Sequence, residues 1–334
     1  MPDSTRPVVA PGCHPIETGR YRVPTRAIND LGEVLLDWIH KRSPGGIITG
    51  RPRLGKTRTV EYLTMQLPRV LGDAAIPMYK ICCNKYRVPT ENTFYGDILM
   101  DLGHAEIKGT IAVRRDRICK YLIAAACASN QRRVILILDD AHRLTRLLYE
   151  CLTDIHNQLD RHEVNLTVFL VGQPELIHQK QSLLAMKAHQ IVGRFMVHEY
   201  QFHGIRSVED VRECLQAYDT GSEYPHGSGW SCTRYYFPTQ FDRGFRLEQY
   251  AEDLWRTFQQ LHSEDGLGPS VEIPMQYFAL TVEYLLTEFG IDGKDVDRRT
   301  KSNLREAVTK SGYVIAEKYA RDNSFDDLVE SGGR

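Results

Sequence analysis

One short stretch near the amino end constrains this chain more than any other. Residues 50–57 read Gly-Arg-Pro-Arg-Leu-Gly-Lys-Thr, which matches the P-loop pattern G-x-x-x-x-G-K-[ST] at every fixed position. The glycines of such a loop allow a tight turn that directs backbone N–H groups at phosphate oxygens. The lysine reaches the β- and γ-phosphates, and the hydroxyl is a ligand of Mg²⁺. The stretch therefore predicts a nucleoside triphosphate site.

The surroundings of this loop are those that the pattern requires. The apolar run 45–49 predicts a buried strand before it, and apolar spacing over 56–67 predicts a helix after it, ending before Pro68. We expect the nucleotide and its Mg²⁺ to be held by the residues of this loop and the first helical turn, with Thr57 as a metal ligand: Gly50, Arg51, Gly55, Lys56, Thr57 and Arg58. A chance match in a Gly/Pro turn is the alternative.

Short apolar runs alternate with helical periodicity through residue 202. This alternation predicts an α/β fold with a parallel sheet covered by helices on both faces. The expected strands are 45–49, 77–82, 133–138, 166–171 and 197–202, and the expected helices are 26–40, 56–67, 90–102, 111–129, 145–159 and 181–192.

The remaining segments differ in composition from this α/β region of residues 21–205. Residues 1–20 hold four prolines and no periodicity, which predicts a mobile arm. Residues 206–321 predict a C-terminal α-helical lid, with helices near 247–261, 274–289 and 298–320, and 322–334 predict a tail. Within the lid, residues 219–245 are rich in Gly and aromatic side chains. We interpret them as a surface insertion, with a partner-binding loop as the alternative.

Candidate catalytic residues lie next to three of the expected strands. Two of the strands are followed by such residues, and one is preceded by an arginine. Asp139 and Asp140 follow the run Val-Ile-Leu-Ile-Leu, so we expect Asp139 to bind Mg²⁺ and Asp140 to face the attacking water (Walker B). A helix N-cap is the alternative for such a pair. Gln173 is expected to contact the γ-phosphate or orient water, or else is a turn residue. Arg194 precedes the last strand, where an arginine finger would point into a neighbouring subunit, although a surface arginine is the default.

Composition limits the remaining function classes. The net charge of −1 gives no global electrostatic case for nucleic acid, so any DNA-binding surface is expected to be local. No apolar run is long enough for a membrane span, and residues 1–6 do not read as a signal peptide. The eight cysteines include no C-x-x-C pair, which favours free thiols in a reducing cytoplasm over disulfides or a zinc site.

These motifs, in this order, carry a family resemblance. Residues 50–57, 138–142 (Leu-Asp-Asp-Ala-His), 171–176 (Val-Gly-Gln-Pro-Glu-Leu) and 193–195 (Gly-Arg-Phe) resemble the AAA+ ATPases of the TnsC/TniB group, the ATP-dependent regulators of transposition in CRISPR-associated and related transposons. The resemblance implies an ATPase in which Gln173 is sensor 1 and Arg194 a finger acting in trans. Position 140 departs from the family, which usually has Glu, so slow hydrolysis is expected.

The resemblance also implies partners. Subunits with bound ATP are expected to form rings or helical filaments around double-stranded DNA and to connect a target-selection protein with a transposase. The residues expected to touch DNA lie between the second strand and Asp139, namely Lys85, Lys108, Arg114 and Arg115, with Arg87, Arg117 and Lys120 in the same stretch. A solvated helix face explains such charges equally well. Arg298 and Arg299 are candidates for the sensor-2 arginine of the lid.

Two other functions remain open at this point. An ExeA-like ATPase of a secretion or envelope system shares the Gly-Gln-Pro-Glu-Leu stretch, but such a protein would normally add a membrane span or cell-wall module. A P-loop kinase shares the loop, but kinases usually bring arginines from their own lid and do not need the Asp pair and Arg194.

Overall fold

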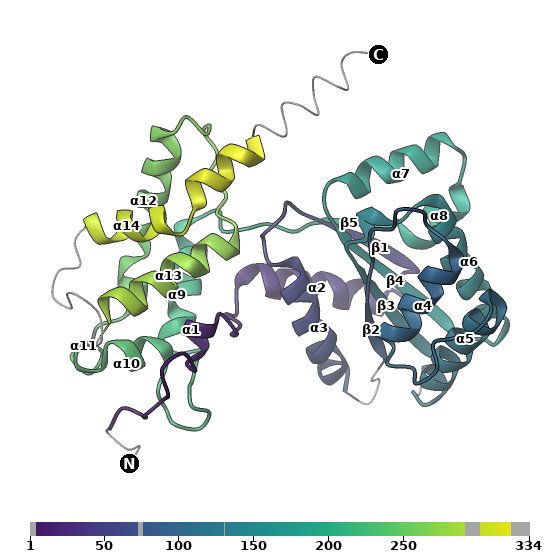
Figure 1. Cartoon of the computed structure of the whole chain (residues 1–334), viewed down its shortest axis with the longest axis horizontal. Coiled ribbons are helices and arrows are strands. Elements are labelled where there is room, and N and C mark those ends of the chain that lie inside the picture. The colour runs from purple at the N-terminus through teal and green to yellow at the C-terminus, as the bar shows by residue number, and fades with distance from the viewer. Residues whose placement is uncertain (1–4, 73–75, 130, 291–300, 322–334) are drawn as a thin grey trace. The chain divides into compact units, whose positions relative to one another are not determined.

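The computed structural model describes residues 5–72, 76–129, 131–290 and 301–321. The chain divides into two compact units. The sheet unit comprises residues 30–52 and 56–202, and the helical unit comprises residues 1–29, 53–55 and 203–334. Figure 1 labels the elements of both units.

The sheet unit is built on five parallel strands. They are β1 (Gly45–Thr49), β2 (Met78–Cys82), β3 (Arg133–Asp139), β4 (Asn165–Gly172) and β5 (His198–Gln201), and their order in the sheet is β2-β3-β4-β1-β5. The expected α/β fold and all five expected strands are confirmed. Every residue of β3 is buried, as is typical of a strand covered by helices on both faces.

Helices cover the two faces of this sheet. They are α2 (Arg26–His40), α3 (Lys56–Val70), α4 (Glu91–Asp101), α5 (Ile111–Cys127), α6 (Arg146–Arg161), α7 (Glu175–Ala185) and α8 (His189–Phe195). Alternate side chains of β3 and β4 pack with α4 to α8 in one core, while Trp38 of α2 lies against Phe169 from the other side. Gly46 makes this approach possible, because an added Cβ would lie 2.5 Å from the Trp38 ring.

Two helix boundaries differ from the prediction. Helix α3 continues through Pro68 to Val70, whereas we expected it to end at residue 67. A proline lacks the N–H that bonds four residues back, and one this close to the end of a helix disturbs few bonds. The expected helix 181–192 is in fact two helices, α7 and α8, which a turn at Met186–Ala188 separates. Lys187 has a φ of +57° there, which a continuous helix does not allow.

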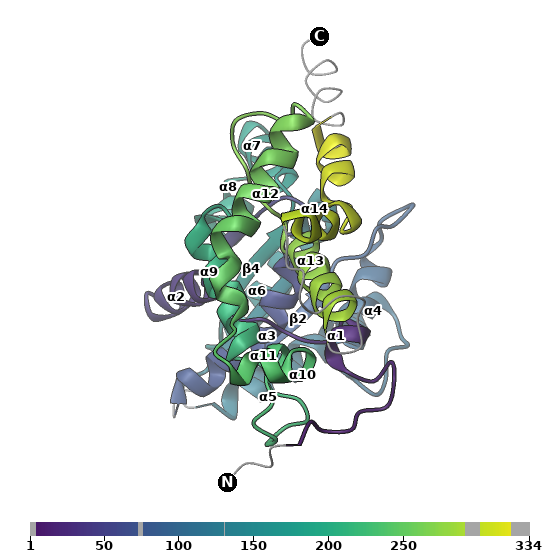
Figure 2. The same cartoon turned by 90° about the vertical axis from the view of Figure 1, so that its left-hand side faces the viewer.

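The helical unit contains the remaining elements. They are α1 (Pro15–Thr18), α9 (Val208–Asp219), α10 (Cys232–Tyr236), α11 (Pro238–Asp242), η3 (Leu247–Tyr250), α12 (Ala251–Glu264), α13 (Met275–Phe289) and α14 (Lys301–Lys310), and residues 313–321 are also helical. Helices α9, α12, α13 and α14 pack around a second hydrophobic core (Figure 2). Helix α9 was not among the expected elements.

The aromatic segment 219–245, which we expected to be a surface insertion, is buried in part. Trp230 is only 2% exposed, and Tyr235, Tyr236 and Phe237 lie in the core of the helical unit. The buried carboxylate of Asp219 accepts hydrogen bonds from the backbone of Leu247 (2.9 Å) and Glu248 (3.1 Å), which ties the two ends of the segment together. Large aromatic rings gain most free energy when they are buried, and these four belong to the core, while residues 220–229 between Asp219 and Trp230 form an exposed or half-buried loop.

Two residues of the segment that we expected to be a mobile arm, residues 1–20, are buried. His14 and Ile16 are buried in the helical unit, where the His14 ring stacks on Tyr235 with centroids 4.4 Å apart. His14 Nδ1 accepts a hydrogen bond from Ile16 N over 3.2 Å and caps α1. Within residues 5–20, His14 and Ile16 therefore anchor the segment to the core of the helical unit.

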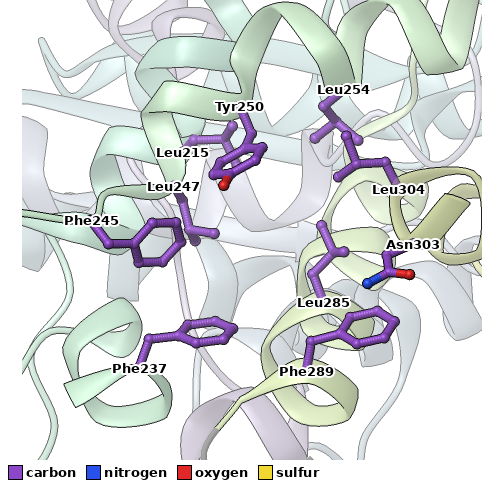
Figure 3. A pocket seen from close by; sticks show the side chains of 10 residues that line it. All are labelled: Leu215, Phe237, Phe245, Leu247, Tyr250, Leu254, Leu285, Phe289, Asn303 and Leu304. Atoms are coloured by element: carbon purple, nitrogen blue, oxygen red, sulfur yellow. The ribbon is translucent and has the colours of Figure 1, made fainter. Parts of the chain in front are cut away.

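A small apolar cavity of about 40 Å³ remains in the helical unit (Figure 3). Phe237, Phe245, Phe289 and several leucines line it, and the amide of Asn303 points toward it. A space of this size holds little more than an alkyl group, so it is a packing gap rather than a site for a nucleotide.

The structure also bears on the expectations about cysteines and membrane-spanning helices. All eight cysteines are free, as predicted, and five of them are buried: Cys83, Cys119, Cys151, Cys214 and Cys232. Among the residues that the structure describes, no helix is both long and apolar enough to cross a bilayer.

Candidate nucleotide site

The strand order brings three of the predicted motifs to one edge of the sheet. β1 lies beside β4, with Thr49 paired to Gly172, and the N–H of Gly50 donates to the Gly172 carbonyl over 3.2 Å. β3 lies on the other side of β4. The P-loop after β1, Gln173 after β4 and Asp139 at the end of β3 therefore share the carboxyl edge, where parallel sheets bind ligands.

The P-loop leads directly into α3, which begins at Lys56. Lys56 Nζ donates to the carbonyls of Gly50 and Arg51, each over 2.6 Å, so its ammonium lies within the curve of the loop. Gly55 has a φ of +98°, a conformation that side chains disfavour. Thr57 and Arg58 are exposed in the first turn of α3. The dipole of this helix start favours an anion such as a phosphate.

Asp139 is almost fully buried, and both of its carboxylate oxygens have neighbours. Oδ1 accepts from the N–H of Asp140 over 3.0 Å, and Oδ2 lies 3.7 Å from Nζ of Lys80 on β2. Lys80 Nζ also donates to Glu61 Oε1 on α3 over 2.7 Å. Burial lowers the pKa of Lys80, but the hydrogen bond to Glu61 and the negative charges around it outweigh burial, and the pKa is raised overall.

Asp140 lies beside Asp139 but has different contacts. Its φ is +54°, and its Oδ2 lies 3.0 Å from Nη2 of Arg143. Nη1 of the same arginine donates to the Cys83 carbonyl, just after β2, over 3.2 Å. Asp140 precedes a short 3-10 helix, Ala141–Arg143, yet its side chain makes no capping hydrogen bond. The N-cap alternative for this carboxylate is therefore not what the structure shows.

Gln173 contacts a histidine from the Asp-Asp-Ala-His stretch. Its Nε2 lies 3.3 Å from His142 Nε2, which connects the end of β4 with the loop after β3. The pKa of His142 is lowered, mainly by burial. Sequence reasoning assigned no role to His142, Lys80 or Arg143. His142 could have been noticed from its place in the motif, whereas Lys80 reads as one polar residue in an apolar strand.

Arg194 lies in α8, near the opposite end of β1. An added Cβ at Gly45, the first residue of β1, would lie 2.7 Å from the Arg194 carbonyl, whereas the P-loop follows the last residue, Thr49. Five residues of strand separate these ends by about 13 to 17 Å. Arg194 Nη2 donates to Asn157 Oδ1 of α6 over 3.1 Å. The structure thus does not bring Arg194 together with Lys56, Asp139 and Gln173.

The four basic residues predicted to touch DNA fall into two groups. Lys85 and Lys108 are exposed, and neither forms a side-chain ion pair with another residue that the structure describes. Arg115 instead lies 2.9 Å from Asp154, and Arg114 Nη1 donates to the Asn92 carbonyl over 2.6 Å. Nearby, Arg117 donates to the Lys108 carbonyl and Lys120 pairs with Asp116. The sensor-2 candidates, Arg298 and Arg299, lie outside the described residues.

The oxygen ligands at this edge fit a magnesium ion. Mg²⁺ is bound in nucleotide sites by one or two protein oxygens together with phosphates and water. Asp139 offers a buried carboxylate at the end of β3, and Thr57 offers a hydroxyl next to Lys56. The hydroxyl and the carboxylate supply oxygen ligands for Mg²⁺, and the Lys56 ammonium is suited to the phosphates that such an ion also binds.

The comparison with known protein families agrees with this arrangement. Residues 39–179, which include the P-loop, Asp139, Asp140 and Gln173, match the family described as an AAA domain. This part of the chain is an AAA domain. Such a domain is a P-loop ATPase, which in general uses ATP and Mg²⁺. No curated protein sequence matches the chain significantly.

Solved structures share the fold of this AAA domain and its helical unit. The ORC2 protein of Aeropyrum pernix, solved in ADPNP and ADP complexes, has a TM-score of 0.56 at 13% identity, covering 89% of this chain and 71% of its own. The Walker-type ATPase paby2304 of Pyrococcus abyssi has a TM-score of 0.51 at 11% identity, covering 90% and 75%. At such low identity the likeness establishes the fold alone.

Proposed function

We propose that this protein is an ATP-dependent AAA+ regulator that oligomerises on duplex DNA and links target selection to transposase recruitment. The AAA domain supports the ATPase part of the proposal. The resemblance of the P-loop, the Asp pair, the Gly-Gln-Pro-Glu-Leu stretch and Gly193–Phe195 to the TnsC/TniB group supports the transposition part.

One observation carries the oligomeric part of the proposal. Arg194 lies beside the amino end of β1, while Lys56 and Asp139 lie at the carboxyl edge of the same sheet. An arginine at that distance cannot reach the phosphates of its own subunit. It is suited to a neighbouring subunit's site, where its charge would stabilise the transition state.

The residues at the carboxyl edge then have separate tasks. Lys56 and the start of α3 bind the phosphates, and Thr57 and Asp139 hold Mg²⁺, which neutralises charge on the β- and γ-phosphates when it is bound. Asp140 orients the attacking water, and Gln173, held near His142, contacts the γ-phosphate. An aspartate is one methylene shorter than a glutamate and reaches less far toward the water, so we expect slow turnover.

Lys85 and Lys108 support the DNA-binding part because they are exposed and available to phosphates. Each subunit of a ring or filament would repeat these charges along the duplex, so a nearly neutral chain can still bind DNA without sequence preference. Such contacts position the protein but carry no sequence information, which leaves target choice to a separate protein.

The Lys56→Ala variant tests the proposal. Without the ammonium on the β- and γ-phosphates, the variant should lose ATP binding and also ATP-dependent assembly on plain duplex DNA. Binding of a fluorescent ATP analogue and electron microscopy with ATP and DNA measure the two effects. ATP-dependent rings or filaments formed by Lys56→Ala would contradict the assigned site.

The wild-type protein separates the competing functions in the same experiment. An ATPase that assembles on DNA should hydrolyse ATP faster with duplex DNA and form rings or filaments. A P-loop kinase would stay monomeric, with turnover unaffected by DNA. For an ExeA-like envelope ATPase, neither turnover nor assembly would respond to DNA.

A further inference from the structure

Lys80 is placed between two carboxylates, one of which belongs to the proposed metal site. It lies in the middle of β2, and its side chain is only 19% exposed. Its Nζ is 2.7 Å from Glu61 Oε1 on α3 and 3.7 Å from Asp139 Oδ2 on β3. The helix that follows the P-loop is thus connected to the metal-binding aspartate through one cation.

We propose that Lys80 is a built-in counter-ion of Asp139, shared with Glu61, that sets how readily Asp139 takes Mg²⁺. The proposal rests on the nucleotide site described above. Asp139 is buried, and a buried carboxylate without a compensating charge is costly. Lys80 supplies that charge before Mg²⁺ binds, and it competes with Mg²⁺ for the same carboxylate.

Glu61 decides how strongly Lys80 holds Asp139. The Lys80–Glu61 contact, at 2.7 Å, is 1.0 Å shorter than the Lys80–Asp139 contact, at 3.7 Å. Glu61 therefore draws the ammonium away from Asp139 and leaves Oδ2 more accessible to a metal ion. Since Glu61 lies in the helix that begins with Lys56 and Thr57, a shift of α3 on nucleotide binding would move Lys80 relative to Asp139.

Two substitutions should therefore change Mg²⁺ binding in opposite directions. Lys80→Met keeps the length of the side chain and removes its charge, so half-maximal binding of a fluorescent ATP analogue should need about three- to tenfold less Mg²⁺. Glu61→Gln leaves Asp139 as the one ion-pair partner of Lys80 among the described residues, so about three- to tenfold more Mg²⁺ should be needed.

A second measurement concerns stability rather than nucleotide binding. Lys80→Met should unfold at a lower temperature than wild type in EDTA, because Asp139 then has no compensating cation. Adding Mg²⁺ and the ATP analogue should raise its melting temperature by more than it raises that of wild type.

Lys180→Met is a matched control. Lys180 lies 2.6 Å from Glu199, and its side chain is 19% exposed, the same as that of Lys80. It belongs to α7 and has no contact with a proposed metal ligand among the described residues. Its removal should leave the Mg²⁺ requirement unchanged.

The outcomes distinguish this inference from the assignment of the site itself. Opposite shifts for Lys80→Met and Glu61→Gln, with none for Lys180→Met, support the counter-ion role. If Lys80→Met does not fold, Glu61→Gln alone decides. An unchanged or lowered Mg²⁺ requirement in Glu61→Gln overturns the inference. Asp139→Asn is the reference: if it too leaves the Mg²⁺ requirement unchanged, the proposed metal site is wrong as well.

Discussion

Arg194 donates a hydrogen bond of 3.1 Å to Asn157, and the two residues lie on α8 and α6, toward the end of the sheet that faces away from the P-loop. Its neighbours Ile191 and Phe195 are buried and fix α8 on the sheet unit. The guanidinium is thus held in a defined place on a surface remote from its own nucleotide site. A residue so placed can act on ATP only in another copy of the chain.

Arg194→Ala should therefore bind ATP about as tightly as wild type while turnover falls by a factor on the order of 10³ or more. The arginine stabilises transition-state charge rather than the bound substrate, so kcat should fall and affinity should not. Mixing Arg194→Ala with Lys56→Ala should restore some hydrolysis, because intact arginines of one variant meet intact P-loops of the other. Activity no higher than the sum of the separate variants, in rings shown to be mixed, would rule out action in trans.

Asp139→Asn and Asp140→Asn should differ although the residues are adjacent. Asp139 is buried and is the proposed metal ligand, so its loss should weaken binding of Mg²⁺ and ATP together. Asp140 is half-exposed and faces Arg143, so Asp140→Asn should keep ATP affinity, block turnover and lengthen the lifetime of assemblies on DNA. Titration calorimetry and electron microscopy compare the two. Equal losses of ATP affinity would show that the carboxylates share one role.

The double variant Lys85→Ala/Lys108→Ala should bind DNA more weakly at every sequence. Each lost phosphate contact should make the plot of log affinity against log salt concentration less steep by about 0.9. Lys120→Ala is the control, because Lys120 is exposed in the same region but pairs with Asp116 over 2.7 Å. Equal effects of the control and the double variant would favour a solvated basic face over a specific DNA contact.

His14 should make the stability of the protein depend on pH. Its pKa is lowered to about 4, chiefly by burial, with a smaller opposing effect of Glu17 and a further lowering by Arg6. Between pH 6.5 and 4 the unfolded chain takes up a proton at His14 that the folded chain does not. The free energy of unfolding should therefore decrease as the pH falls through this range and should be unaffected by this group above pH 6.5.

His14→Asn isolates that contribution. The asparagine carbonyl can accept the hydrogen bond from Ile16 N, as His14 Nδ1 does, but it does not titrate. Other, half-buried histidines, among them His156 and His203, also have lowered pKa values, so the wild-type curve contains several contributions. Urea unfolding at a series of pH values should show a shallower slope for the variant. Parallel curves would mean that His14 is not buried as described.

The sequence predicted the sheet and most of the helices around it because their signals are local. A P-loop is contiguous, and strands such as Arg133–Asp139 are apolar throughout because both faces are covered. The same local signals misled elsewhere. Pro68 indicated a helix end, although α3 continues to Val70. The prolines before residue 20 indicated a mobile arm, although His14 and Ile16 are buried, and the composition of 219–245 indicated a surface insertion, although Trp230 is buried.

The sequence by itself determined which residues follow β1, β3 and β4, and a parallel sheet places all such residues at its carboxyl edge. That β1 and β3 lie on either side of β4 was decided by the tertiary structure. Only the tertiary structure decided which side chains complete that edge and the helical core. Lys80 contacts Glu61, 19 positions before it, and Asp139, 59 positions after it. His14 contacts Tyr235, which is 221 positions further along the chain. Such contacts depend on how helices and strands pack, which no local pattern encodes.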